Sequence, residues 1–391
     1  MSGARRPSRQ ALQRLGDVAV DRFVRNYWQR RPLLIRQAIP DFRVPVTAAR
    51  LFELACHPDV ESRLVSRTAG RWRVQHGPFE QGALPLRRKA DWTLLVQGVD
   101  LHDADAAALG ARFRFLPAAR FDDVMISYAA DRGGVGPHVD QYDVFLLQAQ
   151  GRRRWRIARN FDERLVAGLP LRVLAHFRHE HEWLLEPGDL LYLPPGVAHE
   201  GVALGECITV SIGFRVPLAQ ELAEAWADRR AREMPLEGRL ADGTRRATRA
   251  PARLPTTLVD AALHQLRRIV PTRKETQRML LEHLTEPKPT VYFTAPSPAM
   301  SRRRFDQAAR TRGLRLDLRS RMLYEGRDFA INGELLQASA AAGPWLRKLA
   351  DDGALAAENV AGKARARELP EQLLALAHAW YRFGWIHLAV K

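Results

Sequence analysis

The segment from residue 119 to residue 217 restricts the possible folds of this chain more than any other part. It contains short stretches of strand-like composition, most of them separated by glycine or proline turns: FDDVMISYA, DVFLLQAQ, RRRWRIA, HEWLLEPGD, LLYLPPG and CITVSIGFRV. Many short strands with repeated turn signals are typical of antiparallel sandwiches and barrels. We therefore predict that this segment forms an antiparallel β-sandwich or barrel.

The regions on both sides of this segment have mixed and helical patterns. Helical spacing of apolar residues predicts a helix over residues 8–30, PLLIRQA then reads as a short strand, and SRLVSRTAGRWRVQHG predicts a hairpin turning at Ala69 and Gly70. After Pro217, LAQELAEAWADRRARE, TTLVDAALHQLRRIV and ETQRMLLEHLTE predict helices, with a Pro-, Arg- and Thr-rich link at 243–255. Their apolar stripes need a cover, either each other or a dimer partner.

From about residue 290 a further unit is expected. Helical stretches surround RMLYEGRDFAINGELL, in which Asn332 and Gly333 predict a tight turn. Helices combined with such a β-wing are typical of a winged-helix-like domain. The predicted fold class is α+β, with a barrel domain and its helical lead-in over 1–217, a helical region over 218–288 and a winged-helix-like domain over 289–391.

Composition narrows the choice of compartment and partner. A chain of 391 residues without an uncharged apolar run of about 18 residues predicts two or three domains and no membrane span. Cys56 and Cys207 make neither a disulfide framework nor a CxxC pair, which is typical of a reducing cytoplasm. The net charge of +17 makes nucleic acid a candidate partner. Because nearly all of that charge is arginine, a bias that genome composition can produce, direct nucleic-acid binding is not favoured.

The motif GPHVDQYDVFLL, residues 136–147, places polar groups at the start of an apolar strand. Alternation along a strand puts His138, Asp140 and Tyr142 on one face, which Val144 and Leu146 continue toward the interior. An unpaired carboxylate that points into a sheet interior is costly. A metal ion is a partner that would use both the histidine and the aspartate.

A second motif, EPGDLLYLPPGVAHEG, supplies a third candidate ligand. Its proline and glycine turns bracket a short apolar strand, and His199 follows the second turn. Two histidines and one carboxylate form the facial site of non-haem Fe(II) oxygenases. Taken singly, each histidine is better explained as a core or loop-capping residue, but together with Asp140 they favour a metal site. A rival cluster, with looser spacing in a polar stretch, comprises His176, His179 and His181.

The strand RRRWRI predicts a buried cation. Arg153, Trp155 and Ile157 share the face expected to point inward, and the opposite, solvated face carries three more arginines: Arg152, Arg154 and Arg156. An inward guanidinium needs an anion, and its planar fork matches a carboxylate at two points. A dicarboxylate such as 2-oxoglutarate would supply that anion.

The preceding strand, FDDVMISY, carries Asp123, Met125 and Ser127 on one face. Asp123 at the barrel mouth can hold a cationic substrate side chain, or it can form an ordinary surface salt bridge. The residues alone leave these two interpretations open.

The barrel motifs, with SIGFR, YWQRRPLLIR and DWTLLVQGVD, resemble those of the bacterial JmjC-type ribosomal oxygenases. The resemblance is dense over residues 26–216 and weaker beyond them. It implies a JmjC/cupin double-stranded β-helix with a C-terminal winged helix. It also implies that His138, Asp140 and His199 bind Fe(II), and that Arg153 holds the C5 carboxylate of 2-oxoglutarate, to whose site we also assign Ser127. Substrate contacts are implied at four positions: Asp123, Met125, Tyr142 and Ser211.

The function implied by this resemblance is protein hydroxylation with Fe(II), 2-oxoglutarate and O2. The bacterial branch that this chain resembles hydroxylates the β-carbon of an arginine in large-subunit ribosomal protein sixteen. The family's order of domains implies that 218–288 is a helical dimerisation region and that the protein is a homodimer. Other interpretations remain open: a JmjC-type lysine demethylase, a hydroxylase of another basic protein, a zinc-dependent cupin isomerase, or a basic protein that only binds nucleic acid.

Overall fold

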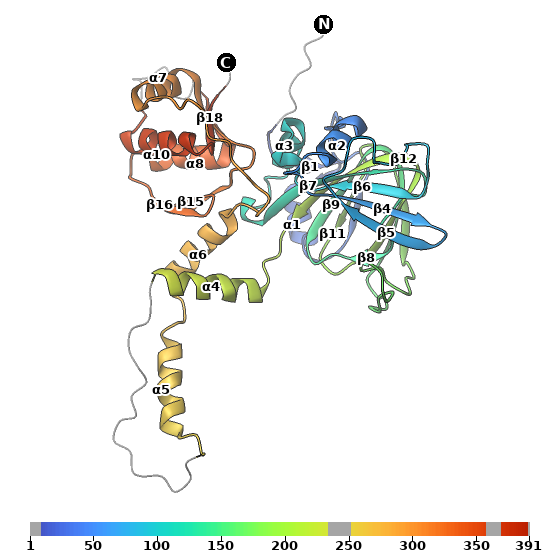
Figure 1. Cartoon of the computed structure of the whole chain (residues 1–391), viewed down its shortest axis with the longest axis horizontal. Coiled ribbons are helices and arrows are strands. Elements are labelled where there is room, and N and C mark those ends of the chain that lie inside the picture. The colour runs from blue at the N-terminus through green and yellow to red at the C-terminus, as the bar shows by residue number, and fades with distance from the viewer. Residues whose placement is uncertain (1–8, 234–251, 357–368, 390–391) are drawn as a thin grey trace.

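The protein is described by a computed structural model that covers residues 9–233, 252–356 and 369–389 (Figure 1). A large β-sheet unit is followed by helices that lead to a smaller C-terminal unit, and one of these helices, α5 (Thr256–Arg267), extends away from both. No helix among the described residues is long and apolar enough to cross a membrane. The predicted α+β class is confirmed.

The barrel unit is built on a ten-stranded antiparallel sheet in the described part of the chain. Its strands, in chain order, are β3 (Leu33–Ile35), β4 (Ser62–Thr68), β5 (Arg71–His76), β6 (Trp92–Val96), β7 (Phe121–Ala129), β8 (His138–Val139), β9 (Asp143–Ala158), β10 (His181–Leu185), β11 (Leu190–Leu193) and β12 (Ala198–Phe214). Along the sheet the order is β3-β11-β9-β12-β7-β6-β4-β5, with β10 beside β9 and β8 beside β12. The predicted hairpin at Ala69 and Gly70 is confirmed by the β4–β5 pair.

The two longest strands close the barrel. β9 pairs with β12 along most of its length, while its other edge pairs first with β11 and then with β10. The sequence had suggested two separate strands in this region. They are one strand instead, because Gly151 adopts a positive φ of 64° and lets the ladder bend and shift register without ending.

Alternation along β9 separates two apolar cores. Val144 and Leu146 face the barrel interior together with Trp155 and Ile157. Phe145 and Leu147 face the N-terminal elements. The rings of Phe23, Trp28 and Tyr192 pack around Phe145 there. The inward face expected from the sequence is confirmed, whereas burial of the opposite face around Phe145 was not predicted.

The N-terminal elements differ from the predicted helix over residues 8–30. Residues 14–19 form a small hairpin, β1 (Arg14–Leu15) and β2 (Val18–Ala19), and only α1 (Val20–Asn26) is helical. Gly16, with φ 53°, makes the turn, so the prediction was wrong over the first half of that range. The other helices that cover the sheet unit are α2 (Ala48–Ala55), α3 (Ala104–Ala111) and the short 3₁₀ turns η1 (Val99–Leu101) and η2 (Ala118–Arg120).

The C-terminal part follows the predicted order of helices and then a β-wing. Its described helices are α4 (Ala219–Glu233), α5, α6 (Arg273–Thr285), α7 (Arg302–Arg312), α8 (Gly343–Asp352) and α10 (Glu371–Arg382). Its strands are β13 (Gly313–Leu316), β14 (Met322–Glu325), β15 (Asp328–Ile331), β16 (Glu334–Gln337), β17 (Ala354–Ala356) and β18 (Ile386–Leu388). β14, β15 and β16 form the wing, with Asn332 and Gly333 in the predicted turn. Residues 243–251 of the predicted link lie outside the described residues.

The C-terminal unit contacts the sheet unit next to β7. Arg321, just before β14, donates hydrogen bonds to the backbone carbonyls of Phe121 and Asp122 at the start of that strand. Arg114, after α3, donates to the carbonyl of Asp351 in α8. The unit therefore lies against the strand that carries several of the predicted site residues.

Candidate functional site

Three of the predicted site residues meet because of strand register. His138 in β8 is the direct cross-strand partner of His199 in β12, and Asp140 follows β8 by one residue. The two imidazole rings lie with centroids 4.3 Å apart. The sequence had suggested one strand running through residues 138–147. That strand is interrupted between β8 and β9, and β8 pairs with β12 instead.

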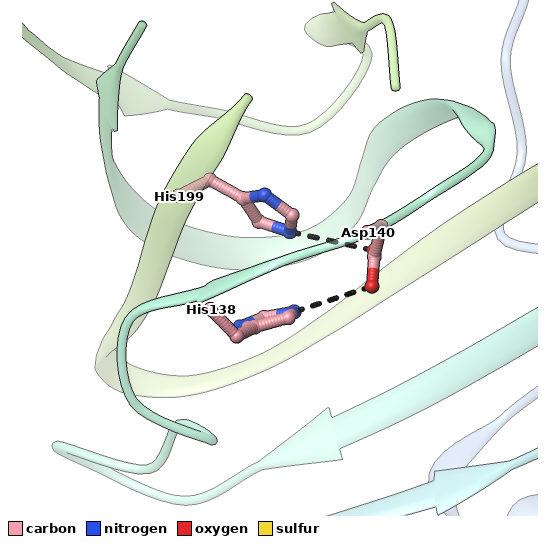
Figure 2. Close-up of side chains that lie close together, drawn as sticks. All are labelled: His138, Asp140 and His199. Atoms are coloured by element: carbon pink, nitrogen blue, oxygen red, sulfur yellow. Dashed lines mark ion pairs between the residues drawn. The ribbon is translucent and has the colours of Figure 1, made fainter. Parts of the chain in front are cut away.

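The potential ligand atoms of these residues face one another (Figure 2). Nε2 of His138 is 3.9 Å from Oδ1 of Asp140, and Nε2 of His199 is 3.6 Å from Oδ2. Atoms bound at right angles to one ion, each about 2.1 Å from it, are about 3 Å apart. The observed spacings are slightly wider, so a shared ion would draw the side chains together by small movements. Among the described residues, His138, Asp140 and His199 are the side chains whose potential ligand atoms lie close enough together to hold one metal ion.

Hydrogen bonds fix the histidine tautomers in a way that suits metal binding. Nδ1 of His138 is 2.9 Å from the carbonyl of Gly136, and Nδ1 of His199 is 3.0 Å from that of Val197. A carbonyl only accepts, so both Nδ1 atoms carry protons and donate, leaving the Nε2 lone pairs free. Burial, followed by the neighbouring His138, lowers the pKa of His199 to about 4. The neutral imidazole that a metal requires is therefore the form present at neutral pH.

Arg153 is a buried cation beside this group. Its Nη1 donates to the hydroxyls of Ser127 (3.1 Å) and Thr209 (3.3 Å), and Nη2 donates to the carbonyl of Gly201 (3.2 Å). The guanidinium also lies 5.0 Å from the ring centre of Trp155, whose ring lies 6.0 Å from that of His199. Arg153 is 4% exposed, so this whole arrangement is inside the barrel.

Among the described residues, the direct hydrogen-bond partners of the Arg153 guanidinium are all neutral. No carboxylate in the described part of the chain pairs with it, and its buried Nε makes no hydrogen bond. Burial lowers the pKa of Arg153 below its usual value. A buried cation without a counterion is costly, and a bound carboxylate would supply both the charge and the missing acceptor. These residues therefore fit the dicarboxylate cosubstrate that the sequence predicted.

Gly201 leaves the space for this arrangement. A Cβ at position 201 would lie 2.7 Å from Nε of Arg153 and 2.8 Å from the ring of Trp155, closer than real contacts allow. The signal available in the sequence was only a glycine two residues after His199. Thr209 was likewise missed: it is the cross-strand partner of Ser127, and its hydroxyl donates to Gln148 (3.0 Å). Register between distant strands brings it to Arg153, which no local pattern reveals.

A pocket nearby is lined by all four residues predicted to contact substrate: Asp123, Met125, Tyr142 and Ser211. Met125 and Ser211 are cross-strand partners on β7 and β12, two residues along each strand from the pair that contacts Arg153. Asp123 is 8% exposed, and burial raises the pKa of its carboxyl. Tyr142 lies in the turn between β8 and β9 and is 37% exposed; desolvation of its hydroxyl, followed by the charge of Asp140, raises the pKa of that hydroxyl.

The pocket has a second wall that the sequence did not suggest. Lys288, Thr290, Val291, Tyr292 and Arg319 line it from the C-terminal part of the chain. The rival cluster of His176, His179 and His181 is exposed and does not assemble as a metal-binding group within the described ranges. Cys207 is buried and Cys56 partly buried, and neither forms a disulfide.

Three family models match this chain. Residues 108–222 match the JmjC domain, and residues 263–385 match the ROXA-like winged helix. A model of the AraC-like ligand binding domain also matches residues 173–286. The two main matches coincide with most of the barrel strands and with the C-terminal winged unit.

Curated relatives are similar to this chain over about half of its length. The chain is 43% identical over 207 residues to the ribosomal protein uL16 3-hydroxylase of Escherichia coli, covering 53% of this chain and 55% of that protein. It is 36% identical over 208 residues to a probable ribosomal oxygenase of Haemophilus influenzae, covering 52% and 51%. The chain thus spans about half the length of these curated relatives in the aligned segments.

Solved structures extend the similarity to nearly the whole chain. The X-ray structure of E. coli ycfD matches with a TM-score of 0.86 and 32% identity, covering 96% of this chain and 100% of that one. A structure of the E. coli ribosomal oxygenase YcfD in complex with cobalt and 2-oxoglutarate matches with a TM-score of 0.82 and 31% identity, covering 96% and 99%. On this fold, domain order and identity, the chain belongs to the family of JmjC-domain ribosomal oxygenases.

Proposed function

We propose that this protein is an Fe(II)- and 2-oxoglutarate-dependent hydroxylase that acts on the β-carbon of an arginine in a large-subunit ribosomal protein. The observation that carries the proposal is the placement of the His138, Asp140 and His199 group inside one barrel beside the guanidinium of Arg153, which has no counterion among the described residues. A metal site alone would fit many cupins. The buried cation without a counterion is what selects a dicarboxylate cosubstrate.

The side chains divide into two binding roles. Nε2 of His138, Nε2 of His199 and the carboxylate of Asp140 would hold the iron, and Arg153 with its hydroxyl neighbours would hold the C5 carboxylate of 2-oxoglutarate. When bound, ferrous iron with 2-oxoglutarate and O2 supplies the oxidising power that converts a C–H bond into C–OH, with succinate and CO2 as the other products. The protein's own contribution is to fix both groups relative to each other inside the barrel and to limit the access of water.

The pocket at Asp123 supports an arginine as the target. Its carboxylate can pair with a guanidinium, while Met125 and Tyr142 offer surfaces for the aliphatic stem and Ser211 a hydroxyl. The name of the E. coli relative, a ribosomal protein uL16 3-hydroxylase, supports a ribosomal protein as the substrate. A ribosomal substrate in turn supports a cytoplasmic location.

The same proposal includes a homodimer and three units, over 1–217, 218–288 and 289–391. Helix α5 buries none of its residues and exposes Val259, Leu263 and Leu266 along one face, at spacings of four and three residues. An exposed apolar stripe of this kind is a candidate surface for a second copy. Leu263→Asp is expected to give a monomer by light scattering; an unchanged oligomer would remove α5 from the interface.

Intact-mass analysis tests the activity. Incubation with iron, 2-oxoglutarate and purified ribosomal proteins should add one oxygen to one of them, and His199→Ala should abolish the change. His176→Ala, at an exposed histidine outside the site, is the matched control and should behave as the original protein. Loss of methyl groups from a lysine would instead support the demethylase alternative. No mass change on any protein, with iron and 2-oxoglutarate bound, would refute hydroxylation of ribosomal proteins.

A further inference from the structure

The acidic end of the candidate substrate pocket already contains a cation. Nζ of Lys288 lies 3.0 Å from Oδ1 of Asp122 and 3.6 Å from Oδ2 of Asp123. Lys288 is far from β7 in the sequence, after α6, and it reaches the strand across the contact between the C-terminal part and the barrel. The residue proposed to bind the substrate guanidinium is therefore paired before any substrate arrives.

The backbone conformation around Lys288 is restricted, which limits where its side chain can point. Pro287 and Pro289 flank it, and each restricts the backbone next to it. The carbonyl of Lys288 accepts a hydrogen bond from Val291 (2.9 Å), and the carbonyl of Tyr292 accepts one from Arg319 (2.6 Å). The segment thus forms a defined wall of the pocket, with the ammonium group directed at the two aspartates.

The carboxylate of Asp123 can pair closely with only one cation at a time. Its Oδ2 already accepts from the backbone N–H of Gly98 (3.0 Å) in addition to facing Lys288. A guanidinium that binds a carboxylate at two points uses both oxygens, so it competes with the ammonium group for Oδ2. The ammonium group is nearer to Asp122, which gives it a partner when it gives up Asp123.

On the basis of the proposed function, we propose that the ammonium group of Lys288 occupies the cation-binding subsite at Asp123 in the substrate-free protein. The substrate guanidinium displaces this ammonium group toward Asp122. In the substrate-free protein Lys288 compensates a carboxylate that is 8% exposed. It also weakens the binding of every cationic side chain, because each one has to replace an existing ion pair. A lysine suits this role, since its single flexible ammonium makes no two-point bond of its own.

A lysine that occupies the subsite and a lysine that only positions Asp123 have opposite effects on arginine binding when they are removed. If Lys288 only positioned Asp123, its removal would weaken the binding of an arginine. If it occupies the subsite, Lys288→Met should tighten that binding, by about fivefold for the loss of one partly exposed ion pair. The same change should lower the melting temperature of the substrate-free protein, because Asp122 and Asp123 are then left without their cation.

The test measures binding without turnover, on the full-length protein. The probes are a peptide with one arginine among glycine and serine residues, and the same peptide with citrulline, titrated by calorimetry. Lys288→Met and Lys288→Gln should bind the arginine peptide tighter than the original protein, Lys288→Arg should not, and citrulline binding should not change. Lys274→Met is the matched control, at an exposed lysine on α6.

Equal or weaker binding of the arginine peptide by both neutral variants, including no measurable binding, would overturn the proposal. Asp123→Asn should abolish the preference for arginine over citrulline in all backgrounds. Because no hydroxylation is measured, a protein that binds in this pattern but does not modify ribosomal proteins would refute the proposed function and leave the role of Lys288 intact.

Discussion

Replacing Arg153 by methionine should separate the stability of the protein from its affinity for 2-oxoglutarate. The guanidinium is buried, makes three hydrogen bonds to neutral oxygens and has no carboxylate partner in the described part of the chain. Replacing a whole buried ion pair by well-packed apolar residues is often neutral or stabilising by about 1–4 kcal/mol, and removing Arg153 leaves no charged partner behind. Thr209 keeps its hydrogen bond to Gln148. We therefore expect the ligand-free Arg153→Met protein to melt at the same temperature or slightly higher.

The affinity should change in the opposite direction. Truncating one partner of a buried, hydrogen-bonded charge pair costs about 2–5 kcal/mol. At about 1.4 kcal/mol for each factor of ten, 2-oxoglutarate should bind on the order of 10²–10³-fold more weakly. Arg153→Lys keeps the charge but loses the two-point geometry, so an intermediate loss is expected.

Thermal melts with and without 2-oxoglutarate, in the presence of cobalt to prevent turnover, measure both quantities together. Ligand binding raises the melting temperature of the original protein, and this shift should disappear in Arg153→Met. Arg152→Met, on the exposed face of the same strand, is the control and should keep the shift. A variant at position 153 that is strongly destabilised without ligand, yet retains the full shift, would refute the assignment.

Two further changes test the surroundings of the site. Gly201→Ala should destabilise the protein by about 1–3 kcal/mol and weaken 2-oxoglutarate binding, because the new Cβ would overlap Arg153 and Trp155; unchanged melts and affinity would contradict this packing. Asp100 is fully buried, and burial, followed by Asp123, raises its pKa from 3.8 to about 7. Its folded form binds protons more tightly than its unfolded form, so its contribution to stability is lost as pH rises from about 4 to about 7. Asp100→Asn should therefore raise the melting temperature more at pH 8 than at pH 5, and an equal effect at both pH values would count against the raised pKa.

The sequence was sufficient to predict the parts of the site that depend on alternation along one strand. The inward row of Arg153, Trp155 and Ile157 follows directly from period-two burial in β9. The approach of His138 to His199 was expected from motif spacing, but its cause was not, because β8 pairs with β12 instead of continuing into β9. A hydrophobic pattern gives the face of a strand and not the identity of its neighbour.

Residues contributed through tertiary contact were beyond the reach of local patterns. Thr209 reaches Arg153 through the register of β12 against β7, and Lys288 reaches Asp123 from the segment after α6. The N-terminal helix was overextended for a local reason: Gly16 and Asp17 form a tight turn that outweighs the apolar spacing around them. A glycine followed by a polar residue between two apolar stretches is a turn signal that was available in the sequence.

The two charged subsites differ in how the chain treats them without ligands, and this difference has a thermodynamic consequence. Arg153 lies inside the barrel, where no carboxylate from the described residues reaches it, so a bound carboxylate would create an ion pair where none existed. Asp123 lies at the contact between two parts of the chain, where Lys288 already supplies a cation, so a bound guanidinium would only exchange one pair for another. Creating a buried ion pair releases more free energy than exchanging one for another, because the desolvation cost of the unpaired charge was already incurred when the protein folded. Under the proposed function, the cosubstrate site is thus arranged to hold its ligand tightly, and the substrate site to hold and release a side chain that is itself part of a larger protein.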